Sequence, residues 1–228
     1  MTAKVSGGKL NPAVSLGLLV SGSISAPPRI DASQSRTCLL TPSCSAAPLR
    51  CLLEVFMQIL GGVLGAAMSK YLTMGNVILQ NPGCFGPNFG IGGGQIFFWE
   101  LTTTFVLVSV VFATAVDDAA AGHFVSIAPL AIGLSLFACA QASGPFTGGC
   151  LNPARFLGPA IVFGCGWPWF APYIFGQLIG GALAGTIFRL RLKLQQMYTE
   201  HVQELAARQG AEGEDSVPLV PVAAVDSA

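Results

Sequence analysis

Hydrophobic residues group along the chain into long, nearly uncharged runs that are separated by polar stretches. Four runs are long enough to cross a hydrocarbon core about 30 Å thick, which needs roughly 20 apolar residues per helix. Two shorter runs, 11–20 and 152–163, cannot span and are typical of re-entrant half-helices. The pattern predicts an all-α membrane protein with two half-helices and four spanning helices, at 52–72, 95–116, 124–143 and 170–190.

Composition and charge narrow the class of protein further. Hydrophobic residues make up 52% of the 228 residues and charged residues only 10%, whereas a soluble domain has about 25% charged residues. Net charge is zero and the sequence has no basic stripe, which together disfavour nucleic acid as a partner. An intramembrane enzyme would need a nucleophile with a base, or paired acids, and the spans offer neither. We therefore expect no enzyme and no nucleic-acid partner.

The cysteines and histidines show no ligand pattern. Seven cysteines, an odd number, have no CxxC or Cys/His spacing, and the two histidines are far apart in the sequence. We predict no metal site, no cofactor and no disulfide framework. Residues 1–10 lack the apolar core of a signal peptide.

Two short motifs occur twice, in the same order. Leu10-Asn-Pro-Ala13 returns as Leu151-Asn-Pro-Ala154, and the segment from Gln58 (QILGGVLGA) returns from Gln177 (QLIGGALAG). An odd number of predicted helices separates equivalent points, so the two copies have opposite orientations in the bilayer. Such an inverted repeat is typical of transport proteins.

The two units differ in length. The Asn-Pro-Ala motifs are 141 residues apart but the glutamines only 119, so the first unit holds 22 extra residues, which we assign to a polar insert at 21–50. Two spanning helices precede the second motif, and only ten residues precede the first. The predicted domain, 1–190, is thus an incomplete bundle that lacks two helices at its N-terminal end.

The ends of the chain predict its orientation. Arg189, Arg191 and Lys193 follow the last span, and three arginines lie in the insert. By the positive-inside tendency both regions are cytoplasmic, and 73–94 lies on the other side of the membrane. The remainder, 191–228, is predicted to be a cytoplasmic tail with a short helix to Gln209 and a disordered end.

The Asn-Pro-Ala sequence suits the start of a half-helix. Proline at the first turn gives up an N–H that has no partner, and asparagine caps the helix. Two such ends meeting at mid-membrane would orient water and repel cations with the positive poles of their dipoles. One copy alone could be an ordinary turn or cap, but two copies in an inverted repeat favour a pore: Asn11, Pro12, Ala13, Asn152, Pro153 and Ala154.

Two charged residues accompany the second motif. Arg155 is the only lysine or arginine between Lys70 and Arg189. A charge in such a segment is costly and by default functional. The alternative is that it reaches the outer headgroups. Glu100 opens the second span and could accept backbone N–H groups of the loop around Arg155, or it could be a lone interfacial carboxylate.

These motifs resemble those of the aquaporin (major intrinsic protein) family. Segments from Trp99, Ala113, Ile127 and Gly144 are similar to its tonoplast-intrinsic and aquaporin-8-like branch. The resemblance covers 5–20 and about 52–190. It implies a passive channel for water and small neutral solutes in a lipid bilayer, a homotetramer or a mixed tetramer, and a vacuolar, other internal or plasma membrane.

The resemblance also implies a selectivity ring near the outer mouth. Three of its members fall on Ala140, Gly149 and Arg155, and the fourth belongs to a helix that is not predicted here. Water-selective members often have histidine at the position of Ala140, so the ring is expected to be wide, unless Ala140 is simply a packing residue. Ammonia and hydrogen peroxide are candidate solutes. Glycerol is disfavoured, because Phe156 stands where glycerol-conducting members have aspartate.

A different hypothesis is a truncated, non-conducting subunit that only associates with full-length relatives. In the family six spanning helices surround the half-helices, and four are predicted here. The start of 11–20 would then expose polar backbone to lipid unless a partner covered it. We predict that the chain alone does not conduct.

Overall fold

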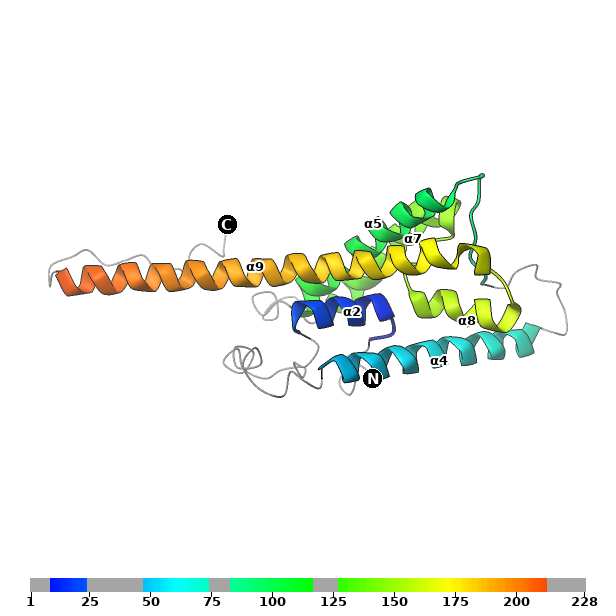
Figure 1. Ribbon diagram of the computed structural model, residues 1–228, viewed down its shortest axis with the longest axis horizontal. Helices are drawn as coiled ribbons and strands as arrows, with labels where there is room; N and C mark the ends of the chain where they lie inside the picture. The colour runs from blue at the N-terminus through cyan, green and yellow to red at the C-terminus, as the bar shows by residue number, and fades with distance from the viewer. Residues whose placement is uncertain (1–8, 24–46, 74–82, 117–126, 213–228) are drawn as a thin grey trace. The chain divides into compact units, whose positions relative to one another are not determined.

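The structure is a computed structural model that describes residues 9–23, 47–73, 83–116 and 127–212. These residues form helices and connecting loops, without a strand among them (Figure 1). In chain order the elements are α2 (Pro12–Ser21), α4 (Ala47–Thr73), α5 (Gly93–Val111), the π-helix η2 (Phe112–Val116), α7 (Ala128–Thr147), α8 (Pro153–Phe163), the 3₁₀-helix η3 (Trp167–Trp169) and α9 (Phe170–Glu212).

The predicted helix classes are confirmed. Within the described residues, four helices are long and apolar enough to cross a membrane, and α2 and α8 are shorter apolar helices. The first span begins at Ala47, so the last residues assigned to the insert belong to a helix. The rest of the insert, 24–46, and the predicted start of the third span, 124–126, lie outside the described residues.

The last helix is longer than predicted. The polar stretch to Gln209 is helical, and it is continuous with the last span, because α9 runs unbroken from Phe170 to Glu212. Leucine, lysine, glutamine, glutamate and alanine dominate residues 190–208, and these strong helix formers give the backbone no reason to stop. By packing, the chain divides into two compact units, Met1–Arg189 and Leu190–Ala228. The candidate site belongs entirely to the first unit.

The half-helices lie end to end between α4 and α9 (Figure 1). Glycines make the close contacts: a Cβ on Gly62 of α4 would lie 2.6 Å from the Ala154 oxygen of α8. Its repeat counterpart Gly181, on α9, lies in the same way against the Ala13 oxygen of α2. Each half-helix therefore packs against the long helix of the other repeat, which is the close small-residue packing that membrane helices use.

Two cations at equivalent repeat positions cap these half-helices. The Lys70 ammonium donates to the Val162 oxygen of α8 at 3.2 Å. Arg189 donates to the Val20 oxygen of α2 at 3.4 Å. A cation near the last carbonyls of a helix offsets the negative pole of its dipole, so both half-helices are stabilised at the end opposite their Asn-Pro-Ala motif.

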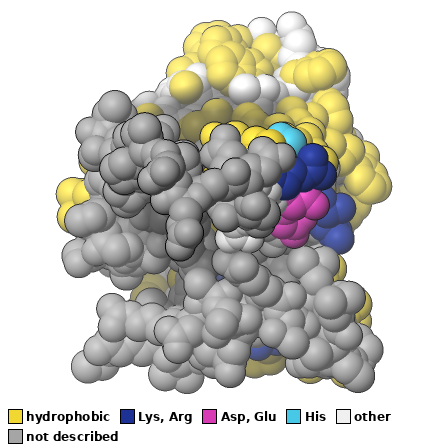
Figure 2. All heavy atoms as spheres, turned by 90° about the vertical axis from the view of Figure 1, so that its left-hand side faces the viewer, with side chains coloured by type: hydrophobic (Ala, Val, Ile, Leu, Met, Phe, Trp, Pro, Cys, Tyr) yellow, Lys and Arg dark blue, Asp and Glu magenta, His cyan; other side chains and the backbone are white. Residues whose placement is uncertain are grey.

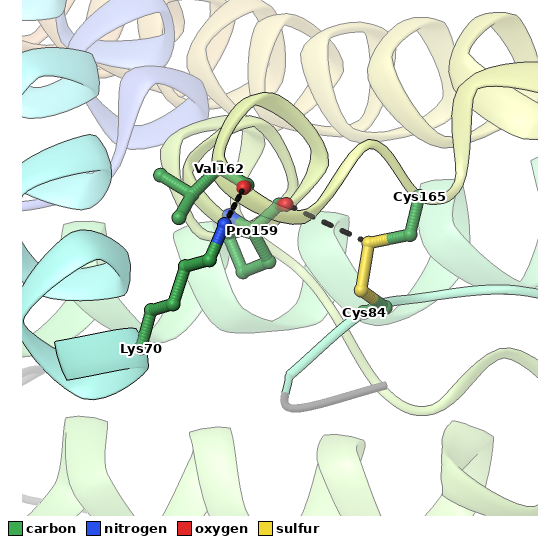
Figure 3. Close-up of a disulfide and its surroundings, with 5 residues drawn as sticks. All are labelled: Lys70, Cys84, Pro159, Val162 and Cys165. Carbon is green, nitrogen blue, oxygen red and sulfur yellow. Dashed lines mark hydrogen bonds between the residues drawn. A yellow bond between two sulfur atoms is a disulfide. The ribbon is translucent and has the colours of Figure 1, made fainter. Parts of the chain in front are cut away.

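The sequence predicted no disulfide framework, but one disulfide is present. Cys84, before α5, and Cys165, after α8, form a disulfide with Cα atoms 6.0 Å apart (Figure 3). The two residues are 81 positions apart in the sequence, so the pairing follows from the tertiary fold and leaves no local spacing signal. Cys51, Cys139 and Cys150 are free and buried.

The outer surface is apolar. In the most hydrophobic window of α4 only 6% of residues are buried within the structure, and in that of α7 only 17%. Figure 2 shows one face, where hydrophobic side chains (yellow) cover much of the described surface and charged side chains gather in a small area. Apolar exposure on this scale fits an integral membrane protein that crosses the bilayer several times.

Candidate pore

Both asparagines cap their half-helices. The Asn11 side-chain oxygen accepts from the Ala13 N–H at 3.0 Å, and Pro12 occupies the first turn of α2. The Asn152 oxygen accepts from the N–H groups of Ala154 at 2.9 Å and Arg155 at 3.4 Å. Each cap leaves the asparagine amide nitrogen available for another partner.

The two amide nitrogens connect the motifs to each other. Asn11 Nδ2 donates to the Leu151 oxygen at 2.9 Å, and Asn152 Nδ2 donates to the Leu10 oxygen at 3.0 Å. The N-termini of α2 and α8 therefore meet, with the positive poles of both dipoles directed at one place. This arrangement of Asn11-Pro12-Ala13 and Asn152-Pro153-Ala154 is the geometry expected of a pore centre.

The start of α2 is not exposed. Pro12, Ala13 and Ser15 are buried, and Asn11 is only 9% exposed. The Ser15 N–H donates to the Asn11 oxygen at 3.1 Å. The expectation that this backbone would be open to lipid is therefore wrong, because α4, α5 and α9 pack around it.

Glu100 holds the loop before the second motif. Its side chain is fully buried, so the interfacial alternative is wrong. One carboxylate oxygen accepts from Thr147 Oγ1 at 2.7 Å and the Cys150 N–H at 3.2 Å. The other accepts from the Leu151 N–H at 2.8 Å and Gln177 Nε2 at 2.7 Å. Four donors compensate for burying the charge.

The held loop contains a strained residue. Leu151 has φ +54°, a left-handed conformation that costs a non-glycine residue about 1–3 kcal/mol. The Glu100 carboxylate binds the N–H of this residue, and its carbonyl accepts from Asn11. Tyr173, fully buried on α9, donates to the Thr147 oxygen at 2.6 Å. These contacts aim the Leu151 carbonyl at the opposite motif.

Arg155 is held by backbone and does not extend away from its loop. Its guanidinium donates to the Gly149 oxygen at 2.7 Å and the Cys150 oxygen at 3.4 Å. The Phe85 ring, from the segment before α5, lies 4.9 Å from the guanidinium carbon. This is a cation–π contact, and it places an aromatic ring beside the charge.

The structure brings the predicted ring positions together. A Cβ on Gly149 would lie 2.7 Å from the Ala140 oxygen and 2.8 Å from its Cα. Gly149 also has φ +63°, which strains any side chain. Gly149 is thus required by packing as well as being small, and Arg155 binds its carbonyl.

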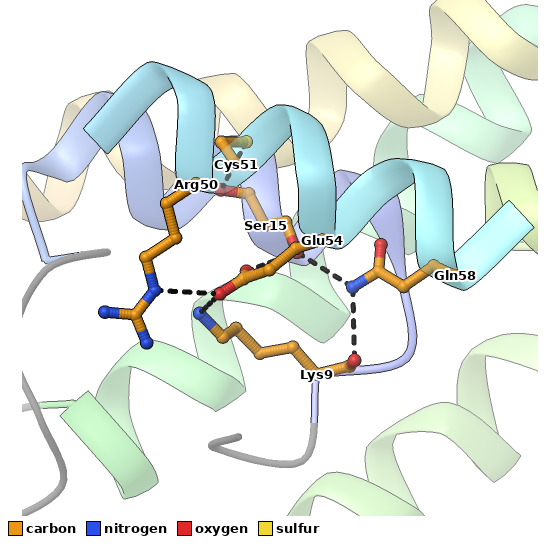
Figure 4. Close-up of polar contacts among 6 residues, drawn as sticks. All are labelled: Lys9, Ser15, Arg50, Cys51, Glu54 and Gln58. Atoms are coloured by element: carbon orange, nitrogen blue, oxygen red, sulfur yellow. Dashed lines mark hydrogen bonds and ion pairs between the residues drawn. The ribbon is translucent and has the colours of Figure 1, made fainter. Parts of the chain in front are cut away.

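A different set of side chains holds the residues around the first motif (Figure 4). Glu54, on α4, pairs with Lys9 at 2.8 Å and Arg50 at 3.3 Å. Gln58 Nε2 donates to the Lys9 oxygen at 3.1 Å and Ser15 Oγ at 3.0 Å. Both repeats therefore use a long helix to hold the residues that precede the half-helix.

Several supporting residues were not predicted from the sequence. Gln58 and Gln177 stand at the start of the repeated segments, so the repeat itself was a usable signal. Glu54 and Tyr173 occupy equivalent repeat positions but differ in chemistry, which hides their shared role. Phe85 carried no signal, because a phenylalanine in a glycine-rich segment has no periodicity to place it.

These features define an inverted-repeat membrane protein with two facing half-helices. The family model "Major intrinsic protein" matches residues 37–188, and the chain belongs to this family.

Curated relatives point to one branch of that family. The chain is 38% identical over 191 residues to "Probable aquaporin TIP-type RB7-18C" of Nicotiana tabacum, covering 82% of this chain and 64% of that protein. It is 34% identical to "Probable aquaporin TIP-type alpha" of Phaseolus vulgaris, covering 89% and 68%. Against "Aquaporin TIP2-3" of Arabidopsis thaliana the identity is 36%, with 82% and 64% covered.

A solved structure has the same fold. The X-ray structure of the aquaglyceroporin from Plasmodium falciparum matches with a TM-score of 0.59 and 25% identity, covering 83% of this chain and 73% of that one. The chain spans 64% of the length of the first curated relative.

Proposed function

We propose that this chain carries the pore of a passive channel for water and small neutral solutes. The observation that supports this most is the reciprocal hydrogen bonding of Asn11 and Asn152, which brings two positive helix ends to one point. Such ends orient water by its oxygen and repel cations. Flow follows the solute gradient, so no cofactor or energy source is needed.

Partners and location follow from the family and the charge pattern. The chain sits in a lipid bilayer, in a homotetramer or in a mixed tetramer with longer relatives. Arg189, Arg191 and Lys193 support a cytoplasmic C-terminus through the positive-inside tendency. The TIP-type names of the relatives favour a vacuolar membrane, with another internal membrane or the plasma membrane as alternatives.

The exposure of α4 and α7 bears on what the chain needs in order to conduct. Both helices are largely uncovered within the structure, so we propose that further helices complete the pore wall beside them. A second candidate function rests on the same exposure, namely a non-conducting subunit that only associates with longer relatives.

Stopped-flow light scattering on proteoliposomes tests the channel. The chain is reconstituted alone and together with the part of a TIP-type relative that lies outside its match to this chain. We expect osmotic water permeability near that of empty vesicles for the chain alone and a several-fold rise with the complementing part. No rise in either, with the chain co-purifying with a longer relative, would support the non-conducting subunit. A full rise for the chain alone would refute the proposal that further helices are needed to complete the pore wall.

Replacing Ala140 with histidine should narrow the pore. Ala140 lies against Gly149, whose carbonyl binds Arg155, so a ring there adds bulk beside the charge. We expect ammonia and hydrogen peroxide permeability to fall several-fold more than water permeability, measured in the same complemented vesicles.

Ala142→His is the matched control, because Ala142 is exposed and two positions further along α7, on another side of the helix. It should leave the solute ratio unchanged. An unchanged ratio in Ala140→His as well would mean that the selective ring lies elsewhere.

A further inference from the structure

The disulfide joins two loops that border the second motif. Cys84 belongs to the segment that leads into α5, and Cys165 follows the end of α8 (Figure 3). Cys84 is directly followed by Phe85, the residue whose ring lies against the Arg155 guanidinium. The covalent tie is therefore one residue away from a contact with the pore arginine.

The Phe85 side chain is buried and closely packed. It is 9% exposed, and its ring centroid lies 6.4 Å from that of Phe156 and 6.3 Å from that of Tyr173. Two glycines leave room for it: a Cβ on Gly148 would lie 3.1 Å from the Phe85 ring, and one on Gly166 would lie 3.0 Å from the Phe85 oxygen. Gly166 directly follows Cys165. The loop after α8 therefore holds Phe85 in two ways, through the disulfide to Cys84 and through the close approach of Gly166 to the Phe85 backbone.

Phe85 also packs in a buried cluster with Ile96, Cys150 and Ile174, and the residues after it contact α7. The Asn88 N–H donates to the Phe146 oxygen at 2.8 Å. The Phe89 ring contacts the Phe146 ring with centroids 6.4 Å apart, and Phe89 itself is 82% exposed. These contacts bind the segment to α7, whereas the disulfide alone ties it covalently to the loop after α8.

We propose that the Cys84–Cys165 disulfide is a positioning element that holds Phe85 over Arg155 and thereby sets the width of the pore mouth. The inference rests on the proposed channel and names a determinant of its selectivity. The positive-inside tendency assigns the segment that contains Cys84 to the side of the membrane away from the reducing cytoplasm, where disulfides persist. Opening the bond frees Phe85 to leave the guanidinium, and larger solutes then pass.

The first test needs no conduction. Phenylglyoxal modifies accessible guanidinium groups, and peptide mass spectrometry reads each arginine separately in the full chain in vesicles. We expect several-fold faster modification of Arg155 in the variant C84S/C165S and in Phe85→Ala, and no further increase when all three changes are combined. Arg50, half exposed and paired with Glu54, is the internal control and should react at one rate throughout.

Chemical reduction of the disulfide in the native chain tests the proposal even if the double variant does not fold. Dithiothreitol is oxidised to its cyclic disulfide while Cys84 and Cys165 each take up a proton and become thiols. Applied to the folded native chain, it should raise the Arg155 rate as the substitutions do. A rate that rises in Phe85→Ala but stays at the native value after reduction and in folded C84S/C165S would overturn the proposal, as would no rise in any of them.

Conduction in the complemented vesicles separates this inference from the channel itself. We expect a several-fold rise in the ratio of urea to water permeability in C84S/C165S. A faster Arg155 rate without water permeability in the native form would remove the channel and leave the positioning role. Water permeability with an unchanged solute ratio would keep the channel and refute the role in selectivity.

Discussion

Replacing Glu100 with glutamine should disable the second motif. Both carboxylate oxygens accept two hydrogen bonds each from buried donors, so in either orientation the glutamine NH₂ group faces two donors. Hydrogen bonds to a charged group contribute about 1.5–3 kcal/mol each, which gives a loss on the order of 3–6 kcal/mol. We expect a markedly lower unfolding temperature in detergent and water permeability near that of empty vesicles.

The matched control is Glu54→Gln. Glu54 also supports a motif, but its side chain is 21% exposed, and its charged partners Lys9 and Arg50 are 12% and 50% exposed, so water can replace part of the lost contacts. Its effect on the unfolding temperature should be much smaller. Equal losses in the two variants would show that the burial of Glu100 has no special role.

A leucine at Gly62 should separate α4 from α8. The added Cβ would lie 2.6 Å from the Ala154 oxygen, and backbone cannot move aside as a flexible side chain can. Overpacking costs typically 1–3 kcal/mol and more where nothing can relax, so we expect a loss of about 3 kcal/mol or more. Thermal unfolding of the purified protein, followed by circular dichroism, measures this.

Gly61→Leu serves as the control, since a Cβ on the neighbouring Gly61 would meet nothing within 4 Å. It adds the same side chain to the same turn of α4, and it should leave the unfolding temperature nearly unchanged. Gly181→Leu, at the equivalent repeat position on α9, should behave like Gly62→Leu because it meets the Ala13 oxygen of α2. If Gly181→Leu resembled Gly61→Leu, the two crossings would not be equivalent.

Hydropathy and the repeat predicted most of the fold. Long uncharged runs fix which segments can span, and Asn-Pro at the start of a short run fixes where α2 and α8 begin, because proline and the asparagine cap act locally. The start of α4 was missed, since Ala47–Arg50 are helical only through continuity with the apolar run. The continuity of α9 beyond the last span was not predicted, because a change from apolar to polar residues ends a span without ending a helix.

The candidate site was predictable where its chemistry was local or repeated. The motif residues and Arg155 are adjacent in sequence, and Glu100 stood out as an acid in an apolar run. The contacts of Phe85 and the Cys84–Cys165 bond join distant segments. Only the folded backbone brings these residues together, so no sequence spacing could have predicted them.

The central claim is that two facing half-helices pass water and exclude cations. One measurement tests it most directly: osmotic swelling and proton leak, recorded in the same vesicles that hold the complemented chain. We predict water permeability several-fold above that of empty vesicles, with a proton leak equal to theirs. Water permeability at the level of empty vesicles, or a proton leak that rises in parallel with it, would contradict the claim.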